Sequence, residues 1–194
     1  MYNLKIINST VRPSRKGPLV VNWMAELARQ HGDFAVEVLD LAEINLPIMN
    51  ELAHPRLKQY EHEHTKQWSA RIEEADAFIF VTAEYDHSYP APLKNALEYL
   101  VQEWGYKAAG IVSYGGISAG TRAATALKAD LIALKVVPLF EAVNIPFFEQ
   151  FINEESGFTP NEISHKSAHV MLNELARWTK GMLVIRGIEK AEMR

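Results

Sequence analysis

Short apolar segments that alternate with helical patterns most strongly constrain how this chain can fold. The run Ala77-Phe78-Ile79-Phe80-Val81 is apolar at every position, which is typical of a strand buried on both faces. The segments 4–7, 34–39 and 108–112, and one that begins at Val136, have the patterns of further strands. Because a helical pattern separates each strand from the next, the sequence predicts a parallel sheet covered by helices on both faces.

Capping signals mark the helices in the second half of the chain. Ser118 is expected to cap a helix that runs to about residue 134. The segment 141–158 looks irregular, and Thr159-Pro160-Asn161-Glu162 then has the pattern of a capping box. We expect residues 1–194 to form one domain, with a C-terminal helical extension from about residue 159.

Composition limits the chemistry that the chain can carry. Cysteine is absent, which excludes disulfides, iron–sulfur clusters, Cys-ligated zinc and a thiol nucleophile. The formal net charge is −4, so we expect no nucleic-acid partner. No stretch approaches the roughly 20 apolar residues of a membrane span. These features predict a cytoplasmic protein without a membrane-inserted segment.

The first of three chemically suggestive loops covers residues 8–18. Ligands of parallel sheets bind beyond the carboxyl ends of the strands, where this loop lies. It leads into a helix, and the first N–H groups of a helix can bind a phosphate. Hydroxyl and guanidinium groups suited to a phosphate follow one another in it: Ser9, Thr10, Arg12, Ser14 and Arg15. Such residues are also common in loops, so a solvated basic turn is an equally simple interpretation.

The second and third loops follow the third and fourth predicted strands. Residues 82–95 read Thr-Ala-Glu-Tyr-Asp-His-Ser-Tyr-Pro-Ala-Pro-Leu-Lys-Asn, which combines aromatic rings with polar groups suited to a flat ligand. Residues 113–120 read Ser-Tyr-Gly-Gly-Ile-Ser-Ala-Gly, and the glycines allow the backbone to approach a ligand closely. Taken singly, each loop is also compatible with an ordinary turn.

Together the three loops resemble those of the NAD(P)H-dependent FMN reductases. The pattern of that family runs Gly-Ser-x-Arg, then Pro-Glu-Tyr-Asn-x-Ser-x-Pro-x-x-Leu-Lys-Asn-Ala, then Ser-x-Gly-Gly. This chain matches it at residues 8–12, 83–96 and 113–116, and the second motif is the specific one. The resemblance covers about the first 140 residues. It implies a flavodoxin-like three-layer α/β/α sandwich with a five-stranded parallel sheet of order 2-1-3-4-5.

The resemblance also implies an activity and a set of site residues. The chain would bind FMN, take electrons from NADPH or NADH, and pass them to a small acceptor such as free flavin or a quinone. Ser9, Arg12, Arg15 and Gly17 would hold the FMN phosphate, with the Thr10 hydroxyl beside them. The ring would be bordered by Glu84, Tyr85 and Asp86, and its other edge approached by Ser113, Gly115 and Gly116. Because flavin carries the chemistry itself, we expect no catalytic side chain and no metal.

Three positions depart from the family pattern. Asn8 replaces its usual glycine, Ala83 its proline and Asp86 its asparagine. A negative charge at Asp86 would disfavour the anionic reduced flavin. These departures motivate one alternative, a ligand-binding or interaction protein whose flavin site has lapsed. A second alternative is a nonenzymatic FMN electron carrier.

Other features suggest assembly or metal binding. On a helix, His62 and His64 would point to different faces, so we do not expect a metal there. His165 and His169 share a face but lack the glutamate of a zinc-protease motif. The family resemblance suggests a homodimer or homotetramer. The helix expected from Leu93 to Trp104 and the C-terminal helix are the predicted contact elements.

Overall fold

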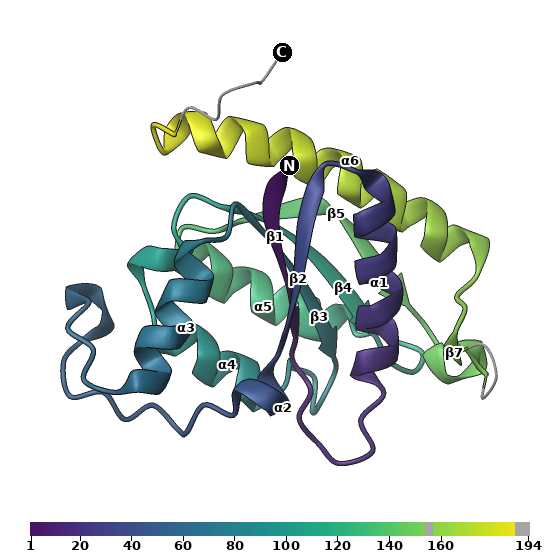
Figure 1. Ribbon diagram of the computed structural model, residues 1–194. Helices are drawn as coiled ribbons and strands as arrows, with labels where there is room; N and C mark the ends of the chain where they lie inside the picture. Colours follow the sequence, from purple (N-terminus) through teal and green to yellow (C-terminus); the bar gives the residue numbers. More distant parts are fainter. Residues whose placement is uncertain (154–156, 189–194) are drawn as a thin grey trace.

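A five-stranded parallel sheet forms the centre of the molecule in the computed structural model, which describes residues 1–153 and 157–188. The strand order is β2-β1-β3-β4-β5 (Figure 1), which confirms the predicted fold class and topology. The strands are β1 (Tyr2–Asn8), β2 (Phe34–Asp40), β3 (Ala77–Ala83), β4 (Ala108–Tyr114) and β5 (Val137–Ile145).

Helices cover both faces of this sheet (Figure 1). One core cluster joins the sheet to α1 (Gly17–His31) and α6 (Glu162–Ile185). A second core cluster joins the other face to α3 (Glu63–Glu73), α4 (Ala91–Glu98) and α5 (Thr121–Ala133). The connecting segments contain α2 (Leu41–Ile44), the 3₁₀ turns η1 (Pro55–Leu57), η2 (Gln102–Trp104) and η3 (Phe148–Phe151), and the small hairpin of β6 (Ile152–Asn153) and β7 (Gly157–Phe158).

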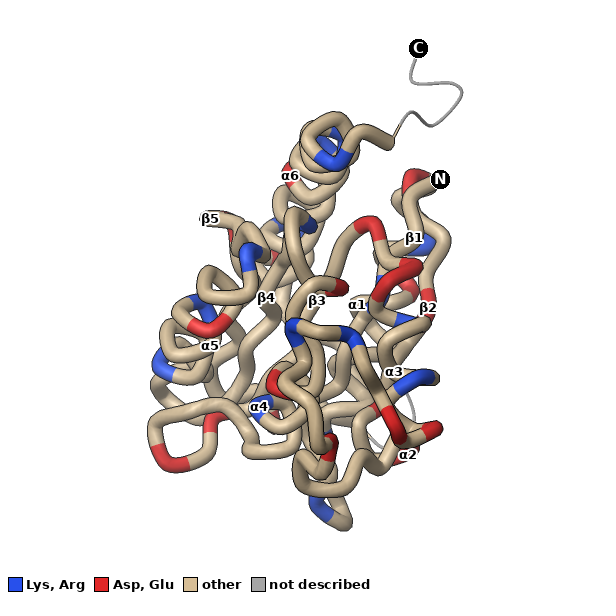
Figure 2. Tube along the Cα trace, turned by 90° about the vertical axis from the view of Figure 1, so that its left-hand side faces the viewer, with Lys and Arg blue, Asp and Glu red and all other residues tan. Residues whose placement is uncertain are grey.

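The apolar run in β3 is explained by these two helical layers. Ile79 and Val81 point into the cluster with α1 and α6, whereas Phe78 and Phe80 point into the cluster with α3, α4 and α5. Successive side chains of a strand point to opposite faces, so a central strand between two layers has no polar face. In Figure 2 the trace of β3 and β4 accordingly lacks the colours of charged residues.

Several predicted boundaries are wrong. Ser118 does not cap α5, because the helix begins at Thr121 after Gly120, and the Ser118 carbonyl instead accepts from the Thr121 N–H. The capping box at 159–162 does not form, since Asn161 is the N-cap and its side chain accepts from the Ser164 N–H at 2.9 Å. Strand β5 continues to Ile145, into the segment predicted to be irregular.

The helix expected from Leu93 to Trp104 is shorter than predicted. α4 ends at Glu98, and Leu93 and Trp104 are fully buried within the chain's own core. Their apolar side chains are therefore not available as subunit contacts. Within residues 1–153 and 157–188, no helix is long and apolar enough to cross a membrane.

Candidate functional site

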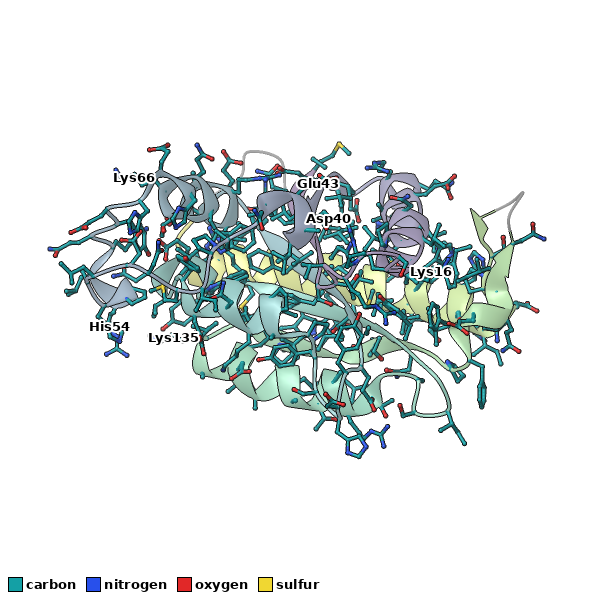
Figure 3. All side chains as sticks on the ribbon, turned by 90° about the horizontal axis from the view of Figure 1, so that it is seen from below. Lys16, Asp40, Glu43, His54, Lys66 and Lys135 are labelled. Atoms are coloured by element: carbon teal, nitrogen blue, oxygen red, sulfur yellow. The ribbon has the colours of Figure 1, made fainter. Side chains whose placement is uncertain are left out.

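The first loop leads from the carboxyl end of β1 to the start of α1, at the edge of the sheet seen in Figure 3. Ser9 and Thr10 are buried there. The Ser9 hydroxyl donates to Thr82 Oγ1 at 3.2 Å, and the Thr10 hydroxyl donates to Asn8 Oδ1 at 3.0 Å. These two hydroxyls therefore fix the shape of the loop from inside.

Asn8 organises the turn where the family pattern has glycine. Its side-chain oxygen accepts from the Thr10 N–H at 3.3 Å, and its amide donates to Asp40 Oδ2 at 3.2 Å. Asp40, at the end of β2 (labelled in Figure 3), also pairs with Arg15 at 2.8 Å. Asn8, Asp40 and Arg15 thus form one network at the carboxyl ends of two neighbouring strands, and Arg15 is partly neutralised within it.

The open part of the first loop lies around Arg12 and the start of α1. The N-cap residue Lys16 makes no side-chain cap. In the described part of the chain, the backbone N–H groups of Arg12, Ser14 and Gly17 have no hydrogen-bond acceptor. Unpaired N–H groups at a helix start, together with an exposed guanidinium, suit a phosphate.

The second loop contains a two-residue β-hairpin. Tyr85 and Ser88 exchange backbone hydrogen bonds at 2.8 and 2.9 Å, and the two residues between them, Asp86 and His87, have φ values of 48° and 65°. Two consecutive positive φ values define the turn geometry that normally selects Asn-Gly or Asp-Gly. The Arg12 guanidinium lies 6.0 Å from the centroid of the Tyr85 ring, which brings the first and second loops together.

Polar contacts anchor the second loop to helix α5. Glu84 forms an ion pair with Arg122, and Tyr89 donates a hydrogen bond to the Asp130 carboxylate. Burial would raise the pKa of Glu84, but hydrogen bonds from Arg122 and Ser118, together with the charge of Arg122, outweigh burial and lower the pKa below its ordinary value. Glu84 is therefore a carboxylate in the folded protein at neutral pH.

The third loop is tied to the end of β5. The Gly115 N–H donates to the Ile145 carbonyl at 3.2 Å, while the Gly115 and Gly116 carbonyls accept from Phe148 and Phe147. The Ser113 hydroxyl is buried and donates to the Ala119 carbonyl at 2.8 Å. A pocket of about 350 Å³ adjoins this loop, lined by Gly115, Gly116, Phe147, Phe148, Glu149 and Gln150.

The structure divides the predicted site residues into two groups. The side chains or backbone of one group are open to a ligand at the carboxyl edge: Arg12, Arg15, Tyr85, Asp86 and Gly116. Those of the other group are buried or already hydrogen-bonded within the protein, and they shape the loops: Ser9, Thr10, Gly17, Glu84, Ser113 and Gly115. Both groups lie on the three loops at one edge of the sheet, as the sequence predicts.

Some residues at this edge escape sequence reasoning. Asp40 is the last residue of the second strand and Phe147 follows the fifth, whereas the sequence singled out only the loops after the first, third and fourth strands. Asp40 could have been found by considering the polar residue at the end of every predicted strand. Asp130 has no local signal, because only the tertiary fold brings it to Tyr89.

The histidines at the start of α3 are arranged differently from the prediction. His62 is the extended N-cap residue rather than part of the helix, so its ring stacks on that of His64 at 5.1 Å. The argument that the two side chains diverge was therefore wrong. Among the residues that the structure describes, no three His, Asp or Glu side chains gather as a metal site.

The topology defines a flavodoxin-like α/β protein, and the three loops converge at the carboxyl edge of its sheet, where proteins of this architecture bind their ligands. Residues 3–150 match the model of the family described as NADPH-dependent FMN reductase. The chain belongs to this family and is an FMN-dependent NAD(P)H oxidoreductase.

Individual relatives agree with this assignment. The chain is 38% identical over 145 residues to an NAD(P)H-dependent FMN reductase of Schizosaccharomyces pombe, covering 73% of this chain and 72% of that protein. It is 27% identical over 140 residues to a quinone reductase of Pseudomonas putida, covering 69% and 72%. The flavoenzyme FerB, an NAD(P)H:(acceptor) oxidoreductase of Paracoccus denitrificans, has a similar fold, with a TM-score of 0.77 at 22% identity over 94% of this chain and 99% of FerB.

Proposed function

We propose that the three loops bind one FMN and that the protein passes electrons from NADPH or NADH to free flavin, a quinone or a similar small acceptor. One observation carries the proposal. The open start of α1 and the Tyr85 hairpin lie side by side, joined by Arg12 at 6.0 Å from the Tyr85 ring. A phosphate end and a ring end of one ligand can therefore be held at the same edge. The residues present fit FMN.

The proposed roles follow the position of each side chain. Arg12, Arg15 and the unpaired N–H groups of the first loop hold the phosphate, while Ser9, Thr10 and Gly17 keep that loop in shape. Tyr85 and Asp86 border the ring from the second loop, and Glu84 supports them from the base of the hairpin. Ser113, Gly115 and Gly116 form the opposite border in the third loop, with Ser113 acting from inside.

FMN held by these residues would supply the hydride and electron-transfer chemistry between the nicotinamide and the acceptor. The protein's own residues bind and orient the two ligands and exclude water from the space between them. No side chain is needed as a nucleophile or general base. Asp86 is exposed at the tip of the hairpin, where its negative charge disfavours negative charge on a neighbouring ring.

We further propose a single cytoplasmic domain that assembles as a homodimer or homotetramer. Helix α6 packs on β4, β5 and α1, so the segment from about residue 159 belongs to the same core. Exposed apolar side chains support self-association, among them Phe140, Ile163 and Val184. The acidic net charge supports the absence of a nucleic-acid partner.

The test is a spectrum of the protein purified without added flavin, followed by anaerobic addition of NADPH or NADH. Flavin absorption that bleaches within seconds supports the reductase. Flavin absorption that persists with both nucleotides would instead favour an electron carrier. If no flavin copurifies, FMN is titrated in, and failure to bind it would leave the lapsed-site alternative.

A further inference from the structure

Helix α5 contacts the second loop at both of its ends. At the start of the loop, Glu84 Oε1 accepts from Arg122 Nε at 2.5 Å and Glu84 Oε2 accepts from the Arg122 backbone N–H at 3.2 Å. At its end, Tyr89 donates to the Asp130 carboxylate, whose other oxygen lies 2.8 Å from Lys94 Nζ. Arg122 and Asp130 are about two helical turns apart, so one rigid helix fixes the separation of the two ends.

Glu84 also completes the start of α5. The N-cap of this helix is Gly120, which has no side chain to accept from the first free N–H groups. The Glu84 carboxylate, from a different loop, accepts the N–H of Arg122 instead. The Glu84 side chain is only 7% exposed, and both of its oxygens already bind Arg122.

The same helix begins where the third loop ends. The Ser118 carbonyl accepts from both the Thr121 N–H and the Thr121 hydroxyl at 2.9 Å. The Ser113 hydroxyl, at the end of β4, closes the loop by donating to the Ala119 carbonyl. The Glu84–Arg122 pair therefore connects the second loop to the first turn of the helix that directly follows the third loop.

We propose that Glu84 and Arg122 are positioning residues that couple the second and third loops, so that the two borders of the flavin ring are held at one fixed separation. Tyr89 and Asp130 hold the far end of the second loop. This inference rests on the proposed function. It assigns Glu84 an action through Arg122 rather than through direct contact with the flavin.

The hairpin between these anchors needs such support. Asp86 and His87 both have positive φ, a conformation that costs energy for residues other than glycine and persists only when the surroundings enforce it. Two anchors on one helix supply that constraint. Releasing either anchor is expected to loosen the hairpin while the side chains of Tyr85 and Asp86 stay unchanged.

The experiment is a double-mutant cycle with Glu84→Gln, Arg122→Met and the combined variant, in which FMN affinity is measured by fluorescence titration. Each single change is expected to weaken FMN binding about five- to tenfold, as the loss of one or two charge-assisted hydrogen bonds would. The combined variant is expected to bind no more weakly than either single variant. Additive losses would overturn the inference, because they would mean that Glu84 and Arg122 act on FMN separately.

Two measurements distinguish a loss of positioning from a direct effect of charge: the reduction potential of bound FMN and the hydrogen exchange of the hairpin amides. If the two charges acted directly on FMN, Glu84→Gln would raise its reduction potential and Arg122→Met would lower it. Loss of positioning instead weakens binding in both and speeds exchange of the Tyr85 and Ser88 amides, which bond across the hairpin. Exchange is measured on the flavin-free proteins, so this readout needs no bound FMN.

Two further variants separate the possible outcomes. Tyr89→Phe removes only the hydroxyl that reaches Asp130 and is expected to speed the same amide exchange. Lys128→Gln, at a half-buried position on α5 outside the three loops, is the control and is expected to leave affinity and exchange unchanged. A wild-type protein that never binds FMN would overturn the proposed function. Normal wild-type binding with unchanged exchange in Arg122→Met and Tyr89→Phe would overturn this inference alone.

Discussion

At the scale of single residues, the turn at the tip of the second loop has an unusual composition. Asp86 and His87 occupy a two-residue hairpin turn in which both φ values are positive. Asparagine and aspartate tolerate this region better than other residues with side chains, which explains why aspartate can stand where the family pattern has asparagine. At the second position, where this turn type normally has glycine, the side chain of histidine makes the positive φ costly.

Replacing His87 with glycine is therefore expected to stabilise the flavin-free protein. Relief of the left-handed conformation outweighs the entropy that glycine adds to the unfolded chain, and we expect a gain of about 0.5–1 kcal/mol. Urea denaturation measures the change. Ser88→Gly is the matched control, since Ser88 has no positive φ and should lose a similar amount. A loss of stability in both variants would contradict the role of strain.

At the scale of secondary-structure elements, the start of α1 depends on a glycine for packing. A Cβ atom placed on Gly17 would lie 2.2 Å from Thr10 Oγ1 and 2.5 Å from Asn8 Oδ1. Asn8 and Thr10 are buried and bonded to each other, so neither side chain can move aside cheaply. Gly17 thus lets α1 begin directly against the end of β1, where the first loop turns.

We expect Gly17→Ala to destabilise the protein by about 2 kcal/mol or more, because the new methyl group overlaps fixed polar atoms. FMN binding should weaken as well, since the loop must shift. Gly181→Ala in α6 is the comparison: a Cβ there meets nothing within 4 Å, so the better helix propensity should add up to about 1 kcal/mol. Thermal melting and FMN titration of both variants test the contrast. Equal effects on stability would be inconsistent with it.

At the scale of the whole molecule, charge is buried at the end of the sheet opposite the site. Lys107 precedes β4 and is buried, and its ammonium donates to the carbonyls of Ile72 at 2.7 Å and Glu73 at 3.1 Å at the end of α3. Burial lowers the pKa of Lys107 to about 7, and the charge of Arg186 acts in the same direction. The lysine therefore ties α3 to the sheet but loses its proton near neutral pH.

The stability of the protein is expected to depend on this titration. Between pH 7 and the ordinary lysine value of 10.5, the unfolded chain binds a proton that the folded chain does not, so the free energy of unfolding rises with pH in that window. From pH 6.5 to 8.5 the wild type should gain about 2 kcal/mol relative to Lys107→Met. Urea denaturation at both pH values measures the difference. Lys66→Met, an exposed position on α3, should show no such change, and a flat difference for Lys107 would refute the prediction.

The sequence by itself determined the architecture and the edge at which the site lies. The alternation of buried strands with amphipathic helices leaves few arrangements, and the apolar run of β3 requires cover on both faces. The motif from Ala83 to Ala96 is local, so it could be recognised without knowing the fold. Helix boundaries such as Ser118 and Thr159 were missed because several adjacent residues can cap a helix and packing selects among them.

Only the tertiary structure decided which groups at this edge are free and which are already paired. Arg15 bonds to Asp40, and Glu84 bonds to Arg122, across sequence separations of 25 and 38 residues. Ser9 and Ser113 turn inward because their strands end inside the core. These outcomes depend on the relative placement of distant segments, which local pattern and propensity do not specify.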